Sequence, residues 1–235
     1  MKQSRILLEA LLLFLVFFMP GYIAQDAQAP GGVTTRAMLQ VIVTGIPQLL
    51  LMVYVAEVAS GPPGAWGLIP FLRRDSLLVF LLVLGSFAVV APFVVAVLAV
   101  PSPLSRSLAA GYRWSLQDAS QIPVALLFGL TAGYREEFFF RSYLFGRLGQ
   151  LGVPVPLAVL CTTALFTVGH VYEGPLGIAI AAALGTLYSV VYLRRPSLHV
   201  IAIAHGLYNG SVLCLGLLLP RALPAAAGIR IFIWN

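Results

Sequence analysis

The chain has 235 residues, of which 60% are hydrophobic and only 9% are charged, whereas a soluble domain carries about 25% charged residues. Eight acidic and fourteen basic side chains cannot cover the surface of a soluble domain of this length, so a cytosolic soluble protein is excluded and an integral membrane protein is expected. The formal net charge of +6 does not indicate nucleic-acid binding, because the bases lie in short gaps between apolar runs, as in loops that orient membrane spans.

Seven apolar stretches come close to the length of about 20 residues that a helix needs to cross a bilayer. Turn-forming or charged residues separate them. The sequence therefore predicts an all-α protein, a polytopic transmembrane helical bundle of about seven spans. The stretches are Ile6–Ile23, Ala37–Val58, Ser76–Val100, Ile122–Leu148, Pro154–Tyr172, Pro175–Leu193 and Leu198–Leu219.

The first stretch also resembles a signal peptide, since a basic start precedes it and Ala27-Gln28-Ala29 follows it. We interpret it as a span, because it is long enough to cross the membrane and Glu9 interrupts its apolar run. The pairs Arg73-Arg74 and Arg194-Arg195 fall on the same side as the N-terminus. The excess of bases predicts a cytoplasmic N-terminus.

Charged side chains inside an apolar helix are costly, so each one is a candidate functional residue. Glu136, Glu137 and Arg141 lie together in the fourth stretch. Glu137 and Arg141 are four residues apart and predict an ion pair on one helical face. Glu136 is rotated by about 100° from Glu137. It is therefore left without that partner, and a partly desolvated carboxylate is a usable general base. The alternative is a structural pair between Glu136 and Arg135.

Two further polar sites follow in the next apolar stretches. Phe166 and His170 are predicted to share one helical face, and so are His205 and Asn209. The small residues around Gly206 would allow another backbone to approach closely. Taken singly, a His inside a membrane helix is more often a hydrogen-bonded core residue than a ligand. A buried Asn often forms a hydrogen bond that joins two helices.

In combination, Glu-Glu-x-x-x-Arg, Phe-x-x-x-His and His-x-x-x-Asn, in that order on three apolar stretches, resemble the CAAX-protease and bacteriocin-processing family of intramembrane proteases, also called the Abi family. The resemblance covers about residues 122–219. It divides the chain into N-terminal helices with an interfacial segment (1–121), a catalytic helical core (122–219) and a short tail (220–235).

The resemblance implies an intramembrane endopeptidase that hydrolyses a peptide bond of a membrane-associated or lipidated substrate. Glu136 with His170 would activate a water molecule, and His205 with Asn209 would stabilise the oxyanion. Glu137 and Arg141 would form a structural ion pair. No cofactor is firmly implied. Binding of a divalent metal such as Zn²⁺ by Glu136, His170 and His205 remains an open alternative. The chain lacks the His-Glu-x-x-His motif that places two zinc ligands on one helical face.

The expected partners are membrane lipid and a peptide or protein, with prenylated and C-terminally tagged substrates both compatible. The expected location is a prokaryotic cell membrane. One alternative is a non-catalytic immunity or scaffold protein of the same family, because a fold does not fix a function. Another is a transporter or proton relay, although the sequence shows no inverted repeat.

Overall fold

The computed structural model describes residues 2–18, 33–60, 66–99 and 115–222, and these residues are almost entirely helical. Within them, Val33 and Leu116 form an isolated β-bridge. The helical elements are α1 (Lys2–Phe17), α3 (Thr35–Ser60), α4 (Arg73–Ala99), η3 (Ala119–Gln121), α6 (Ile122–Glu137), η4 (Phe138–Leu144), α7 (Phe145–Gln150), α8 (Val155–Val168), η5 (Val171–Glu173), α9 (Gly174–Arg194) and α10 (Leu198–Ala222). The prediction of an all-α fold is confirmed.

Four helical segments are long and apolar enough to cross a membrane, namely Thr35–Val58, Arg73–Val97, Val171–Arg194 and Leu198–Leu217. They support an integral membrane protein, whereas the predicted count of about seven spans is not confirmed. Helix α1 has 16 residues and α8 has 14, which is short for a bilayer crossing. Residues 19–23 of the first predicted stretch lie outside the described residues, as do residues 101–114 of the predicted interfacial segment, 101–121.

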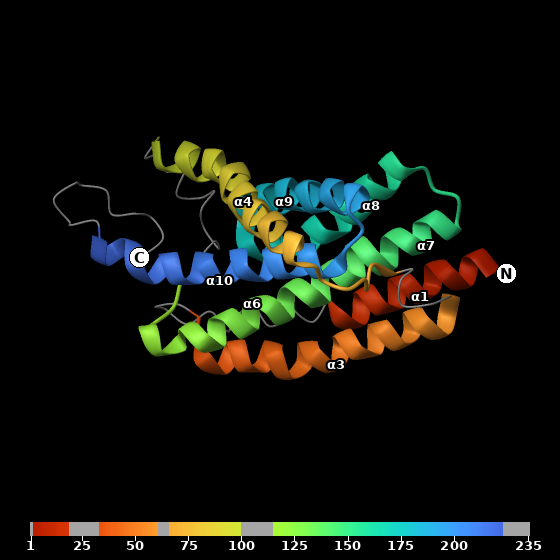
Figure 1. Ribbon diagram of the computed structural model, residues 1–235, viewed down its shortest axis with the longest axis horizontal. Helices are drawn as coiled ribbons and strands as arrows, with labels where there is room; N and C mark the ends of the chain where they lie inside the picture. The colour runs from red at the N-terminus through yellow and green to blue at the C-terminus, as the bar shows by residue number, and fades with distance from the viewer. Residues whose placement is uncertain (1, 19–32, 61–65, 100–114, 223–235) are drawn as a thin grey trace.

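Helices α6 and α10 lie side by side, with α3 on the other flank of α6 (Figure 1). Glycines make this contact close. A Cβ atom at Gly206 would lie 2.6 Å from Leu130 Cα, and one at Gly133 would lie 2.5 Å from the carbonyl oxygen of Ala202. The predicted close approach at Gly206 is confirmed. It brings the end of α6, with its two glutamates, against the part of α10 that carries His205.

We expect Gly206→Ala to destabilise the protein, because the added methyl group has no space between two backbones. Overpacking of this kind costs about 1–3 kcal/mol. Gly85→Ala is the matched control, since a Cβ atom at Gly85 meets nothing within 4 Å. Thermal unfolding in detergent measures both variants. Equal melting temperatures for the two would contradict the packing described here.

A π-helical segment, η4, directly follows the two glutamates, and all seven of its residues are buried. Such wide turns often occur at functional sites. Phe139 and Phe140 of η4 pack against Phe14 and Phe18 at the end of α1, with ring centroids 4.9–6.4 Å apart. Helix α1 therefore covers one side of the segment that carries the motif.

Polar contacts reinforce this docking of α1. Glu9 accepts hydrogen bonds from the Tyr143 hydroxyl, at 2.5 Å, and from the Arg147 guanidinium. The acidic residue that interrupts the first apolar stretch is thus paired with a base that is distant in the sequence. The Glu9 carboxylate would be costly in the apolar run of α1 without a partner. Its pairing with Arg147 therefore fixes the position of α1 along η4 and α7.

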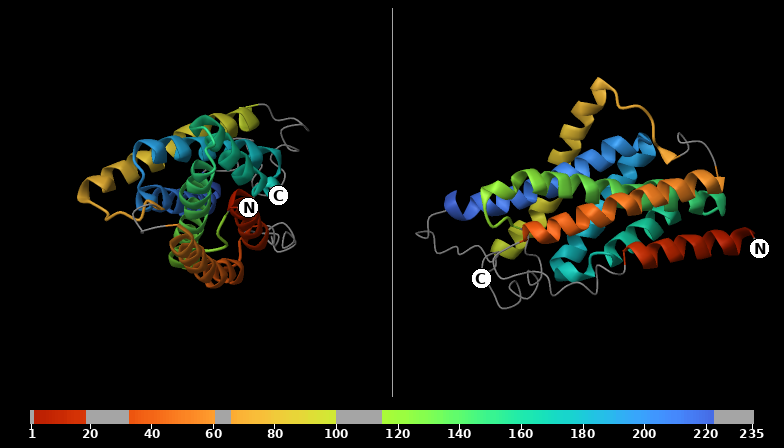
Figure 2. Two further views of the ribbon diagram at one scale, coloured as in Figure 1. Left: turned by 90° about the vertical axis from the view of Figure 1, so that its right-hand side faces the viewer. Right: turned by 90° about the horizontal axis from the view of Figure 1, so that it is seen from below.

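Helix α4 crosses α9 and α10 at a steep angle (Figure 2). Its Ser86 hydroxyl lies 2.9 Å from the Tyr188 hydroxyl of α9, in the buried part of this crossing. At the end of α9, Arg195 Nη2 lies 2.6 Å from Asp75 Oδ1. This contact brings the Arg73-Arg74 and Arg194-Arg195 pairs to the same end of the molecule.

Candidate active site

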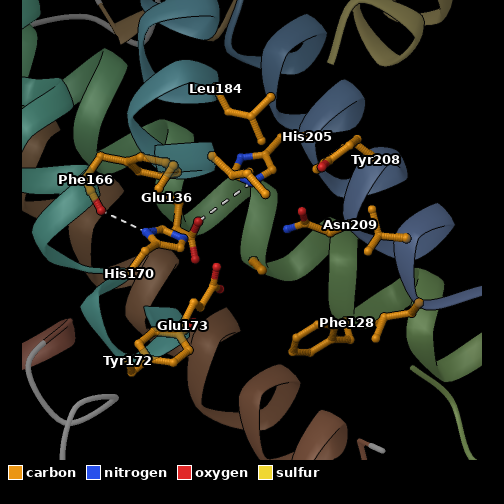
Figure 3. Close-up of a pocket in the computed structure, with 15 residues that line it drawn as sticks. Phe128, Glu136, Phe166, His170, Tyr172, Glu173, Leu184, His205, Tyr208 and Asn209 are labelled. Carbon is orange, nitrogen blue, oxygen red and sulfur yellow. Dashed lines mark hydrogen bonds and ion pairs between the residues drawn. The ribbon is translucent and has the colours of Figure 1, made fainter. Parts of the chain in front are cut away.

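A cavity of about 90 Å³ lies between α6, α8, α9 and α10, enough for a few water molecules. All four of the predicted catalytic residues line it (Figure 3). The full lining is Phe128, Ala132, Glu136, Phe166, His170, Tyr172, Glu173, Ile180, Ala181, Leu184, His205, Tyr208, Asn209, Val212 and Leu213. The fold thus brings together polar side chains that are up to 73 positions apart in the sequence, from Glu136 to Asn209. Apolar side chains form the rest of the cavity lining.

Glu136 faces this cavity from the end of α6. Its Oε2 lies 3.9 Å from His205 Nε2, and its Oε1 lies 3.4 Å from Arg135 Nη2. Both distances are long for an ion pair, so neither partner encloses the carboxylate. Figure 3 shows it beside the ring of His170. Glu136 is therefore within reach of both histidines and of water in the cavity.

Glu137 is not among the residues that line the cavity and is fully buried. Its Oε1 accepts a hydrogen bond from Arg141 Nη1 at 2.9 Å, so the predicted ion pair is confirmed. The same oxygen accepts a hydrogen bond from His205 Nδ1 at 2.7 Å. The guanidinium of Arg141 lies 4.3 Å from the centroid of the Phe166 ring and also donates to the carbonyl of Gly185. One buried charge pair thus contacts three of the elements that build the site.

His170 does not lie on a helix, which corrects the prediction of a continuous stretch to Tyr172. Helix α8 ends at Val168, and His170 sits in the turn before η5, where Gly169 and then Gly174, with φ of 76°, redirect the chain. The expected neighbour is still correct, since the His170 and Phe166 rings are 4.4 Å apart. His170 Nδ1 lies 2.8 Å from the carbonyl oxygen of Phe166. A carbonyl only accepts, so Nδ1 carries the proton and Nε2 of the neutral ring is an acceptor.

His205 is held on two sides. Its Nδ1 donates to Glu137, and its ring stacks on Tyr188 with centroids 5.1 Å apart. Since Nδ1 is protonated, Nε2 donates a hydrogen bond only when the ring is cationic. Asn209 lines the cavity one helical turn further along α10 (Figure 3).

Three further polar residues of the cavity, Tyr172, Glu173 and Tyr208, are absent from the predicted site. In the sequence, Glu173-Gly174-Pro175 indicates only a turn between two apolar stretches. The structure places the side chain of Glu173 in the cavity, on the side of His170 (Figure 3). The available signal was a carboxylate in an apolar setting three residues after a candidate histidine.

A metal on Glu136, His170 and His205 was left open by the sequence. In the described part of the chain, no group of three His, Cys, Asp or Glu side chains is arranged to hold a metal ion. As they lie here, the residues do not fit such a site. The chemistry proposed below therefore has no step that uses a metal.

Residues 118–211 match the model of a family described as type II CAAX prenyl endopeptidase Rce1-like. No curated protein and no solved structure matches the chain. The matched segment begins at the N-cap of η3 and contains every polar residue of the cavity.

Proposed function

We propose that this protein is an intramembrane endopeptidase that uses a water molecule activated by Glu136 and His170, because residues 118–211 match the model of the Rce1-like family of type II CAAX prenyl endopeptidases. The observation that carries the proposal is the meeting of Glu136, His170, His205 and Asn209 around one cavity. The family match supports a protease that acts on a protein or peptide, and the apolar helices support its place in a membrane.

The first step is addition of water to the scissile carbonyl. His170 Nε2 accepts a hydrogen bond from the water, and the Glu136 carboxylate takes its proton as the oxygen attacks the carbonyl carbon. The resulting oxyanion receives hydrogen bonds from the Asn209 amide and from cationic His205. Such donors act most strongly where water is scarce. Glu136 then gives its proton to the leaving nitrogen as the C–N bond breaks, which restores the carboxylate.

The substrate that fits this site is a peptide segment held at the membrane. The cavity combines the polar centre with apolar side chains such as Phe128, Leu184 and Leu213. We propose a lipidated or otherwise membrane-associated substrate, with prenylated and C-terminally tagged proteins both included. We also propose that the protein resides in a prokaryotic cell membrane. The shared position of the two Arg-Arg pairs supports an N-terminus on the cytoplasmic side.

Hydrolysis by the purified protein tests this function directly. Full-length protein in lipid nanodiscs is incubated with farnesylated and unmodified peptides, and products are identified by mass spectrometry. In parallel, membrane proteomes of cells with and without the protein are compared for an uncleaved precursor. Cleavage of a lipidated peptide and one accumulated precursor are expected. The absence of products from every peptide, together with unchanged proteomes, would refute the proposal.

Asn209 separates the metal-free mechanism from a metal-bound one. We expect Asn209→Ala to lower kcat by about 10²–10³-fold with little change in KM, because an oxyanion donor acts mainly on the transition state. Asn209→Asp is expected to be at least as harmful, since its negative charge opposes the oxyanion. A metal ligand at this position would instead tolerate Asp. Activity of Asn209→Asp that a chelator removes would contradict the oxyanion role.

A further inference from the structure

Glu173 is a second carboxylate in the cavity, in addition to the proposed general base. It ends η5, only three residues after His170, and its side chain points into the cavity toward Glu136 and His170 (Figure 3). Only 8% of the residue is exposed. The mechanism given above does not use it, although it lines the same space as the reacting groups.

In the part of the chain that the structure describes, Glu173 is not held by an ion pair, although His170 and His205 line the same cavity. Glu136 has Arg135 and His205 within 4 Å, whereas Glu173 makes no ion pair with any Lys, Arg or His of the described residues. Its neighbouring polar group is the Tyr172 hydroxyl, a hydrogen-bond donor. No Lys or Arg is among the residues that line the cavity. The cavity thus presents two carboxylates, and its basic side chains are the two histidines that the proposed reaction already uses.

The fold makes room for this side chain. A Cβ atom at Gly177, one turn into α9, would lie 2.2 Å from Glu173 Cβ and 2.9 Å from its Oε2. Any larger residue at 177 would displace the carboxyl group. Burying an ionised carboxylate without a partner is costly, and such groups in proteins are normally paired. A buried carboxylate that faces a cavity is therefore suited to a cation brought in by a ligand.

We propose that Glu173 is a specificity residue that binds a basic side chain of the substrate next to the scissile bond. The proposal rests on the peptidase function given above. Because Glu173 and Glu136 line one small cavity, the basic residue lies within one or two positions of the bond that is cleaved. The same negative lining repels a free carboxylate, so the C-terminal carboxylate of the substrate binds outside this part of the cavity.

Matched peptides test the proposal with the full-length protein in nanodiscs. A farnesylated peptide with norleucine on both sides of its cleaved bond is the parent, and lysine replaces one norleucine at a time, which adds a charge at nearly constant shape. We expect lysine at one position to raise kcat/KM about 10-fold or more, mainly through KM, as for a charged hydrogen bond. Glu173→Gln should abolish this preference, so that the ratio of kcat/KM for the lysine peptide to kcat/KM for the norleucine parent falls to about 1 within that variant.

The controls distinguish the possible failures. Glu57→Gln makes the same chemical change at an exposed position on α3 and should keep the lysine preference. A wild-type protein without lysine preference at any position would overturn the proposal, even if Glu173→Gln does not fold. Equal loss of kcat on both peptides would also overturn it, since Glu173 would then act on the reaction itself. If wild type cleaves neither peptide, the peptidase function fails, and fluorescence anisotropy of the two bound peptides still decides the charge preference.

Discussion

Glu136→Gln is expected to lower kcat for peptide hydrolysis by about 10²–10⁴-fold, the usual contribution of a positioned general base. Glutamine keeps the shape of the side chain but cannot accept the proton of the attacking water. The fold should survive, because the contacts of Glu136 with Arg135 and His205 are long, at 3.4 and 3.9 Å. Single-turnover hydrolysis of the farnesylated peptide measures the loss, and the melting temperature in detergent verifies the fold.

The same variant separates an enzyme from a non-catalytic immunity or scaffold protein. A binding role depends on shape and packing, so its cellular phenotype should largely persist in Glu136→Gln. A peptidase role should disappear together with hydrolysis. Glu57→Gln again serves as the control for loss of one acidic group. Hydrolysis by purified Glu136→Gln at a near wild-type rate would show that the general base is a different group.

Local rules predicted those parts of the site that depend on helix geometry. The Glu137–Arg141 pair follows from i,i+4 spacing and is present at 2.9 Å, although the chain between the two residues changes from α- to π-helix. The close backbone approach at Gly206 follows from its small side chain and is also present. Both features are decided within one or two helical turns, where sequence spacing determines which side chains are neighbours.

Other features of the site depend on contacts between distant segments, which spacing does not encode. The Glu137–His205 hydrogen bond joins residues 68 positions apart, and the Glu9–Arg147 ion pair joins residues 138 positions apart. The end of α8 at Val168 was missed because the apolar pattern continues past it. Glu173 was missed because its Gly-Pro neighbours indicate a turn, and a turn gives no direction for the side chain.

The buried pair of Glu137 and Arg141 is expected to have the largest effect on stability. Removing one partner of a buried ion pair costs about 3–5 kcal/mol, because the other charge stays in a low-dielectric interior. Arg141→Ala should cost that much, since Glu137 is fully buried and would keep only His205. Arg194→Ala removes an exposed guanidinium at the end of α9 and should change stability by less than about 0.5 kcal/mol.

The double variant Glu137→Ala/Arg141→Ala should recover part of this loss, because no unpaired charge then remains in the pair. Its activity should still fall, since His205 Nδ1 loses the acceptor that orients the ring toward the cavity. Stability and activity therefore separate: the double variant unfolds later than Arg141→Ala but hydrolyses peptide slowly. Thermal unfolding in detergent and single-turnover hydrolysis give the two values. A double variant less stable than both single variants would mean that the two charges stabilise the protein through other partners and not through each other.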